Sequence, residues 1–136
     1  YFGMRTVGVV DLPGSGHPYV AINGEPVYMQ LALDQAYHPT GFYTFPTDSV
    51  LRDEVLRARQ IGLNGLREHI KVEAPRKLYW ADKLGYLVWG EFADWGCNGY
   101  GPPHDTQRPG PSFVTEWLEA LERDYNHPSI IGWCPM

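Results

Sequence analysis

Four acidic residues and one arginine stand where predicted strands end, and these side chains are the best suited to chemistry in this sequence. The acids are Asp34, Glu68, Glu91 and Asp94, and the arginine is Arg67. Cleavage of a glycosidic bond with retention of configuration needs two carboxyl groups about 5 Å apart, one as nucleophile and one as proton donor. Glu91 and Asp34 are the pair that first suggests this chemistry. In the alternative interpretation, each acid hydrogen-bonds a sugar hydroxyl or a neighbouring arginine.

Arg67 ends an otherwise apolar segment, L-N-G-L-R at 63–67. Burying a guanidinium is costly unless a carboxylate pairs with it, so the sequence predicts that Arg67 pairs with an acid and orients it. His69 and Lys71 follow at spacings of two, and in a continuing strand all three side chains would share one face. In the alternative interpretation, these residues flank a solvated loop.

Trp89 and Trp95 stand on either side of Glu91. An exposed indole beside a polar site is suited to stacking on a sugar ring, whereas the alternative role for each tryptophan is packing in a core or a lid. The chain as a whole is 14% aromatic, with nine Tyr and five Trp. This richness in aromatic residues, together with the acidic ones, favours an uncharged, polar, flat-faced ligand such as a sugar.

The composition of the 136-residue chain excludes several classes of protein. Its 11 basic and 16 acidic residues give a net charge of -5, which argues against a nucleic-acid partner. No apolar run approaches the roughly 18 residues that a membrane span needs, so we expect a soluble protein with no membrane partner. Cys97 and Cys134 form no C-x-x-C pair and His104 has no second ligand at metal spacing. We therefore expect no metal and no other cofactor.

The hydrophobic pattern predicts strands that alternate with helices. A strand at 7–10 leads into a short hairpin with a turn at Asn23-Gly24, and a nearly continuous apolar strand at 27–33 is expected to be buried on both faces. Further along the chain, helices are predicted at 47–62, at about 75–84 and from about 112, and strands at 63–67, 86–92 and 129–134.

This alternation is typical of parallel β/α units, in either a doubly wound sheet or a barrel. The barrel is favoured because no G-x-G-x-x-G or Walker loop follows any strand, and because polar residues collect after the strand ends. A complete (β/α)8 TIM barrel takes about 250 residues, so we expect only about its first four β/α units, preceded by a short β segment. Residues 1–25 would be the end of a β-sandwich domain with a linker hairpin. Residues 26–136 would be the N-terminal half of a truncated barrel.

Six segments carry a resemblance to a known family. They are Y-F-G-M-R-T-V at 1–7, I-N-G-E-P-V at 22–27, L-D-Q-A-Y-H-P at 33–39, G-L-N-G-L-R-E-H-I-K-V-E-A-P-R at 62–76, L-Y-W-A-D-K-L-G-Y-L-V-W-G-E at 78–91 and D-Y-N-H-P-S-I-I-G-W at 124–133. Together they resemble glycoside hydrolase family 2, which contains β-galactosidases, β-glucuronidases and β-mannosidases. The last segment is the most specific, because in the family it is followed within a few residues by Asn-Glu, whose glutamate is the general acid/base.

The resemblance implies a retaining exo-β-glycosidase that hydrolyses a β-linked sugar by double displacement. It also implies that both catalytic glutamates lie beyond Met136, so this chain holds no catalytic residue and is expected to be inactive alone. Arg67 matches the family's arginine on strand two, and Glu91 matches the acid that ends strand three. The substrate-binding residues expected in this chain are Asp34, Arg67, His69, Glu91, Asp94 and Trp95.

Two departures from the family pattern bear on specificity. Many members read R-x-S-H where this chain reads R-E-H-I at 67–70, and classical β-galactosidases read H-E-x-H-P where this chain reads Q-A-Y-H-P at 35–39. Both changes put the metal sites and the galactose specificity of those enzymes in doubt for this chain.

A hypothesis from a different class is a naturally short half-barrel without catalysis. It would bind carbohydrate or associate with a second copy through its open edge strands, since an uncovered parallel edge tends to pair. The sequence ends in W-C-P-M at a predicted strand end with no cover for that edge in view, which favours a truncated enzyme over this alternative.

Overall fold

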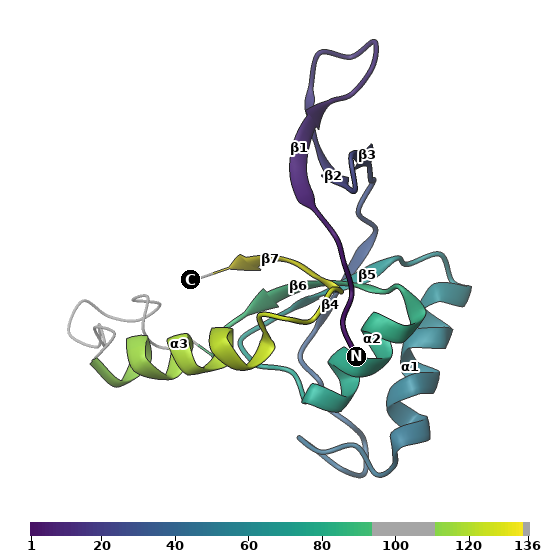
Figure 1. Ribbon diagram of the computed structural model, residues 1–136. Coiled ribbons are helices and arrows are strands. Elements are labelled where there is room, and N and C mark those ends of the chain that lie inside the picture. Colours follow the sequence, from purple (N-terminus) through teal and green to yellow (C-terminus); the bar gives the residue numbers. More distant parts are fainter. Residues whose placement is uncertain (94–110, 135–136) are drawn as a thin grey trace, which may run out of the picture.

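The computed structural model describes residues 1–93 and 111–134 of the chain (Figure 1). Its elements are β1 (Val7–Asp11), β2 (Pro18–Ile22), β3 (Glu25–Pro26), β4 (Leu31–Asp34), α1 (Asp48–Gln60), β5 (Gly65–Glu68), α2 (Pro75–Leu84), β6 (Leu87–Glu91), α3 (Pro111–Asp124) and β7 (Ile130–Cys134). The predicted order of strands and helices is confirmed for these residues.

The first three strands form a small antiparallel sheet in the order β1-β2-β3. Asn23 and Gly24 connect β2 to β3 with φ angles of 53° and 83°. Two successive positive φ angles are what a tight two-residue hairpin turn requires, and Asn-Gly adopts them at little cost. The turn predicted at these two residues is therefore confirmed.

The other four strands of the described residues form a parallel sheet in the order β4-β5-β6-β7, and this sheet is open rather than closed. Helices α1, α2 and α3 lie on one side of it, and the small antiparallel sheet projects away from the helices (Figure 1). Each helix connects two neighbouring parallel strands, as parallel pairing requires. The described part of the chain is thus a mixed α/β structure.

The core fills the space between the parallel sheet and the helices. It consists of Val55, Leu66, Leu78, Ala81, Tyr86, Val88 and Ile130. Helix α1 begins after Thr47, whose hydroxyl accepts a hydrogen bond from the backbone N–H of Val50 at 3.4 Å, and α2 ends at Gly85 in the left-handed conformation. Both helix ends agree with the sequence prediction.

The strand predicted at 27–33 is wrong in its extent and in its burial. Strand β4 spans Leu31–Asp34, and the side chains of Tyr28 and Leu33 are 68% and 58% exposed. The side chain of Asn64 explains the late start, because it donates to the Tyr28 carbonyl and accepts from the Gln30 N–H, both at 2.8 Å. Leu33 is exposed because β4 is an edge strand whose face opposite the helices is not covered by a described element.

The N-terminal segment is tied to the helical layer. The Tyr1 hydroxyl donates to Asp82 on α2 at 2.6 Å, and the Arg5 guanidinium donates to the Ile130 carbonyl at the start of β7 at 2.7 Å. These contacts join residues more than 80 positions apart in the sequence. They fix where the chain enters the parallel sheet.

Candidate functional site

Carboxyl groups collect at one edge of the parallel sheet. Asp34, Glu68 and Glu91 are the last residues of β4, β5 and β6. Because the strands are parallel, their C-terminal ends meet at the same edge, and the collection of polar residues predicted there is confirmed. In open α/β sheets and in barrels this is the edge at which ligands bind.

The polar residues at the strand ends lie on two different faces of the parallel sheet. Leu66 and Val88 pack in the helix-side core, so Arg67 and Trp89, which are partners in the parallel register, point to the opposite face. We call this second face the open face. Glu91 follows Trp89 by two positions and therefore shares the open face.

Arg67 and Glu91 form an ion pair on the open face. The Arg67 guanidinium also contacts the Cys134 sulfur at 3.8 Å. The Glu91 side chain is 5% exposed and that of Arg67 is 38% exposed, so the guanidinium keeps a surface that a ligand can reach. The prediction that Arg67 pairs with an acid is confirmed.

Glu91 is fixed from three directions. One carboxylate oxygen meets Arg67, the other accepts the N–H of Ile70 at 2.9 Å, and its own backbone N–H donates to the Glu68 carboxyl group at 3.2 Å. A carboxylate held by a cation and a backbone donor has a defined orientation. Glu91 is therefore suited to binding a ligand hydroxyl or to holding Arg67 in place.

Glu68 lies on the helix side of the sheet and is 2% exposed. Burial, and after it the neighbouring Glu73 carboxylate, raise the pKa of Glu68 to about 8. Burial has this effect because a charged carboxylate is poorly stabilised away from water. Glu68 thus keeps its proton at neutral pH.

Asp34 also lies on the helix side, because it is the register partner of Glu68 in β5. Its carboxylate forms ion pairs with Lys77 and, at 3.8 Å, with Lys71, and it accepts the Ala36 N–H at 2.6 Å. Burial works to raise the pKa of Asp34, but the two ammonium groups outweigh it and leave that pKa below its ordinary value. Asp34 and Glu91 point to opposite faces of the sheet, an arrangement that does not suit them as a pair of catalytic carboxylates.

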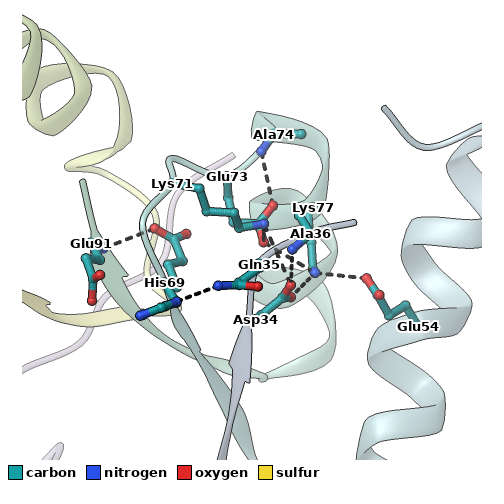
Figure 2. Close-up of polar contacts among 11 residues, drawn as sticks. Asp34, Gln35, Ala36, Glu54, His69, Lys71, Glu73, Ala74, Lys77 and Glu91 are labelled. Carbon is teal, nitrogen blue, oxygen red and sulfur yellow. Dashed lines mark hydrogen bonds and ion pairs between the residues drawn. The ribbon is translucent and has the colours of Figure 1, made fainter. Parts of the chain in front are cut away.

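Sequence reasoning missed the residue at the centre of this helix-side cluster. Lys77 on α2 is 1% exposed and pairs with Asp34, with Glu54 of α1 at 2.8 Å and with Glu73 at 3.3 Å (Figure 2). Burial lowers the pKa of Lys77, but the three carboxylates together raise it above its ordinary value. Its position could have revealed it, because Lys77 shares the buried face of α2 with Leu78 and Ala81.

His69 lies next to the loop that follows β4. Its Nδ1 lies 2.8 Å from the side-chain nitrogen of Gln35 (Figure 2). Beyond His69 the chain leaves the extended conformation, since Ile70 has a φ of 59°. The prediction that Lys71 shares one strand face with Arg67 and His69 is therefore wrong. Lys71 pairs with Glu73 instead.

A cavity of about 500 Å³ lies between the loops that follow β4 and β5. Its lining comprises Gln35, Ala36, Tyr37, Tyr43, Phe45, His69, Ile70, Lys71, Val72, Glu73 and Ala74. The volume falls within the range of about 300–1,000 Å³ that is common for small-molecule sites.

The structure brings together part of the predicted set of binding residues. Arg67 and Glu91 are in contact, and His69 lies two residues beyond Arg67 at the same edge, whereas Asp34 points to the helix side. Asp94 and Trp95 lie outside the described residues. The described residues contain no group of three or more metal-ligating side chains placed to hold an ion, and none of their helices has the length and apolarity to cross a membrane.

No protein-family model matches the sequence, and no curated protein matches it. Solved structures do match. The β-galacturonidase of glycoside hydrolase family 2 from Eisenbergiella tayi is 21% identical, with a TM-score of 0.77. The match covers 97% of this chain and 22% of the galacturonidase chain. The β-glucuronidase of Parabacteroides merdae is 23% identical, with a TM-score of 0.73, and the match covers 97% of this chain and 15% of the glucuronidase chain.

The exo-chitosanase of Amycolatopsis orientalis is a third match, 23% identical with a TM-score of 0.71, and 97% of this chain aligns with 16% of that enzyme. This chain has the fold of glycoside hydrolase family 2. The expected resemblance to that family is thus confirmed at the level of the fold. The chain spans between 15% and 22% of the length of these three family 2 structures.

Proposed function

We propose that this chain is part of a retaining exo-β-glycosidase of glycoside hydrolase family 2, of the β-galactosidase or β-glucuronidase type. The observation that carries the proposal is the Arg67–Glu91 ion pair at the C-terminal edge of the parallel sheet, in a chain whose fold matches three glycosidases over 97% of its length. An oriented carboxylate beside a half-exposed guanidinium is suited to holding sugar hydroxyls.

In this proposal, residues 26–136 are the N-terminal half of a TIM-barrel domain. Two features support it: the four parallel strands of the described residues follow chain order from β4 to β7, and their helices lie on one side (Figure 1). Residues 1–25 would then be the end of a preceding β-sandwich domain and its hairpin. The antiparallel pairing of β1 with β2 is consistent with that origin.

The proposed substrate-binding residues contribute in different ways. Arg67, His69 and Glu91 would contact the sugar directly, because they lie at the C-terminal edge of the parallel sheet. Asp34 would act through Lys71, which it helps to hold at the lining of the cavity. Asp94 and Trp95 complete the proposed set.

Both catalytic carboxyl groups are proposed to lie beyond Met136. In double displacement, one glutamate attacks the anomeric carbon while the other protonates the departing oxygen, and water then releases the sugar from the first glutamate. None of the side chains described here replaces those two groups, so the isolated chain is expected to be inactive.

The test reads the gene beyond codon 136 and assays the full-length protein. We expect Asn-Glu within a few codons, and replacing that glutamate by glutamine should reduce hydrolysis of an aryl β-glycoside by at least 1,000-fold, consistent with loss of an essential acid/base. The same replacement at Glu122, exposed on α3, is the control and should leave the rate unchanged. A full-length protein without this glutamate, or one insensitive to its replacement, would rule the proposal out.

The alternative is a non-catalytic half-barrel that binds carbohydrate or assembles with a second copy. The observation in its favour is that β4 and β7 each pair with one neighbour among the described residues, which leaves two open edges. A stop codon directly after codon 136 would make this alternative the better account.

A further inference from the structure

The 500 Å³ cavity is separate from the Arg67–Glu91 pair. Neither of those two residues lines it, and it is bounded instead by the loops after β4 and β5. His69 lies at the junction, because it lines the cavity and follows Arg67 by two positions. A ligand bound at the Arg67–Glu91 pair could therefore extend into the cavity past His69.

One wall of the cavity is aromatic. Tyr37 and Tyr43 line it with ring centroids 5.4 Å apart, and their side chains are 62% and 78% exposed. Large exposed rings that line a cavity are suited to packing against the apolar face of a pyranose. Neither ring belongs to the hydrophobic core.

The floor of the cavity offers polar groups that match sugar hydroxyls. The side-chain nitrogen of Gln35 lies 2.8 Å from the Nδ1 of His69, and a ring whose Nδ1 accepts from this amide has its Nε2 left to donate. In that tautomer His69 is a donor and the Gln35 carbonyl oxygen an acceptor, and both side chains line the cavity.

The charges around the cavity favour a neutral ligand. Lys71 is paired with Glu73 and Asp34, and Lys77 is paired with three carboxylates (Figure 2). Binding an acidic sugar would require one of these cations to give up its carboxylate partner. A neutral pyranose needs no such exchange.

We propose that the cavity between the loops after β4 and β5 is a subsite for an uncharged pyranose ring, stacked on Tyr37 and Tyr43 and hydrogen-bonded by Gln35 and His69. The inference rests on the proposed function, because that function supplies carbohydrate as the ligand class. Beyond that function, the inference specifies where a second sugar ring binds and that this ring is uncharged.

The test titrates the isotope-labelled chain with methyl β-D-glucopyranoside and with methyl β-D-galactopyranoside, observed by NMR. We expect chemical-shift changes at the Gln35 side-chain amide and at the backbone amides of 69–74 with at least one of the two glycosides. Methyl β-D-glucuronide should bind at least fivefold more weakly. No change in either region at 100 mM of both neutral glycosides, a saturating concentration for a site with a dissociation constant of about 10 mM, would overturn the proposal, as would equal affinity for the glucuronide.

Two variants and one control locate the binding. Tyr37→Ala and Tyr43→Ala should each weaken binding by about three- to tenfold, because each removes one stacking surface. Tyr125→Ala removes an equally exposed tyrosine from the end of α3 and should change nothing. If Tyr125→Ala weakens binding as much as the other two variants, the site lies elsewhere.

The outcome is separable from that of the glycosidase proposal. Hydrolysis by the full-length protein together with an absence of sugar binding in this cavity would remove the subsite and leave the glycosidase. Tyrosine-dependent binding by this chain, with no hydrolysis by the full-length protein, would remove the glycosidase and leave the carbohydrate site.

Discussion

Asp34, Glu68 and Glu91 end three adjacent strands, yet each carboxyl group meets a different environment. Glu91 is paired with the half-exposed Arg67, Asp34 is held by Lys77, and Glu68 is buried beside a second carboxylate. For Asp34 and Glu68 the charge follows from these neighbours rather than from residue type. An ionised Asp34 and a protonated Glu68 therefore end adjacent strands at neutral pH.

The Glu68 carboxyl group should make the stability of the chain depend on pH. Its pKa of about 8 in the folded chain lies above the ordinary value of 4.5. Between these two values the folded state holds a proton that the unfolded state has released, so the free energy of unfolding falls as the pH rises. Relative to Glu68→Gln, the native chain should lose roughly a few kcal/mol between pH 5 and pH 8.5.

Urea denaturation at a series of pH values measures this difference. Glutamine keeps an acceptor for the Glu91 N–H, so the variant isolates the effect of ionisation. Parallel pH profiles for the native chain and Glu68→Gln would show that Glu68 ionises normally.

The Arg67–Glu91 pair should behave as a coupled unit. Arg67→Met leaves the Glu91 carboxylate buried without its cation and should destabilise the chain by about 2 kcal/mol, less than the roughly 3–5 kcal/mol for a fully buried charge pair because the Arg67 side chain is 38% exposed. Adding Glu91→Gln should restore at least half of that loss, since the second change removes the unpaired charge. A double-mutant cycle by chemical denaturation tests this coupling, and strictly additive effects would argue against it.

At the scale of elements, one buried lysine joins parts of the structure that the core alone does not fix. Lys77 connects α2 to the end of β4 through Asp34, to α1 through Glu54 and to the loop after β5 through Glu73. Both loops that line the 500 Å³ cavity begin or end at residues of this network. The geometry of the cavity therefore depends on Lys77 as well as on apolar packing.

Lys77→Met should destabilise the chain by about 3–5 kcal/mol, because it leaves three carboxylates around a position that is 1% exposed. Lys83→Met is the matched control, since Lys83 is exposed on the same helix, and it should change the stability by less than about 0.5 kcal/mol. Thermal and urea denaturation of the two variants measure the difference. Equal stabilities would mean that the network does not support the fold.

At the scale of the whole molecule, the parallel sheet has two free edges among the described residues, β4 and β7. On the open face beside the first edge, Leu33 is 58% exposed. A sheet edge with unpaired backbone groups beside apolar side chains pairs readily with another chain. We therefore propose that the isolated chain self-associates through this edge.

Light scattering coupled to gel filtration between 5 and 200 µM tests the association. The native chain should shift toward a dimer or larger species with concentration, and Leu33→Lys should reduce that shift because a charged edge resists pairing. Ile61→Lys is the control, since Ile61 is 79% exposed at the end of α1, away from the sheet edge. A monomer over the whole range would argue against self-association.

Local features of this protein could be predicted from its sequence because they depend on short-range geometry. The Asn23-Gly24 turn, the Thr47 start of α1 and the Gly85 end of α2 each follow from the conformational preferences of one or two residues. Strand and helix alternation then placed the polar residues at one edge of a parallel sheet. It follows that Arg67 and an acid could be expected to meet there.

The face of the sheet that each side chain occupies, and the charge states of Asp34 and Glu68, were decided only by the tertiary structure. Period-two alternation relates neighbours within a strand, but which face the helices cover depends on contacts between distant segments. That is why Asp34 points toward Lys77 instead of joining Glu91, and why Glu68 is protonated at neutral pH. The sequence by itself determined that polar residues gather at the C-terminal ends of the parallel strands, whereas long-range packing decided which face of the sheet each one occupies and whether Asp34 and Glu68 are charged.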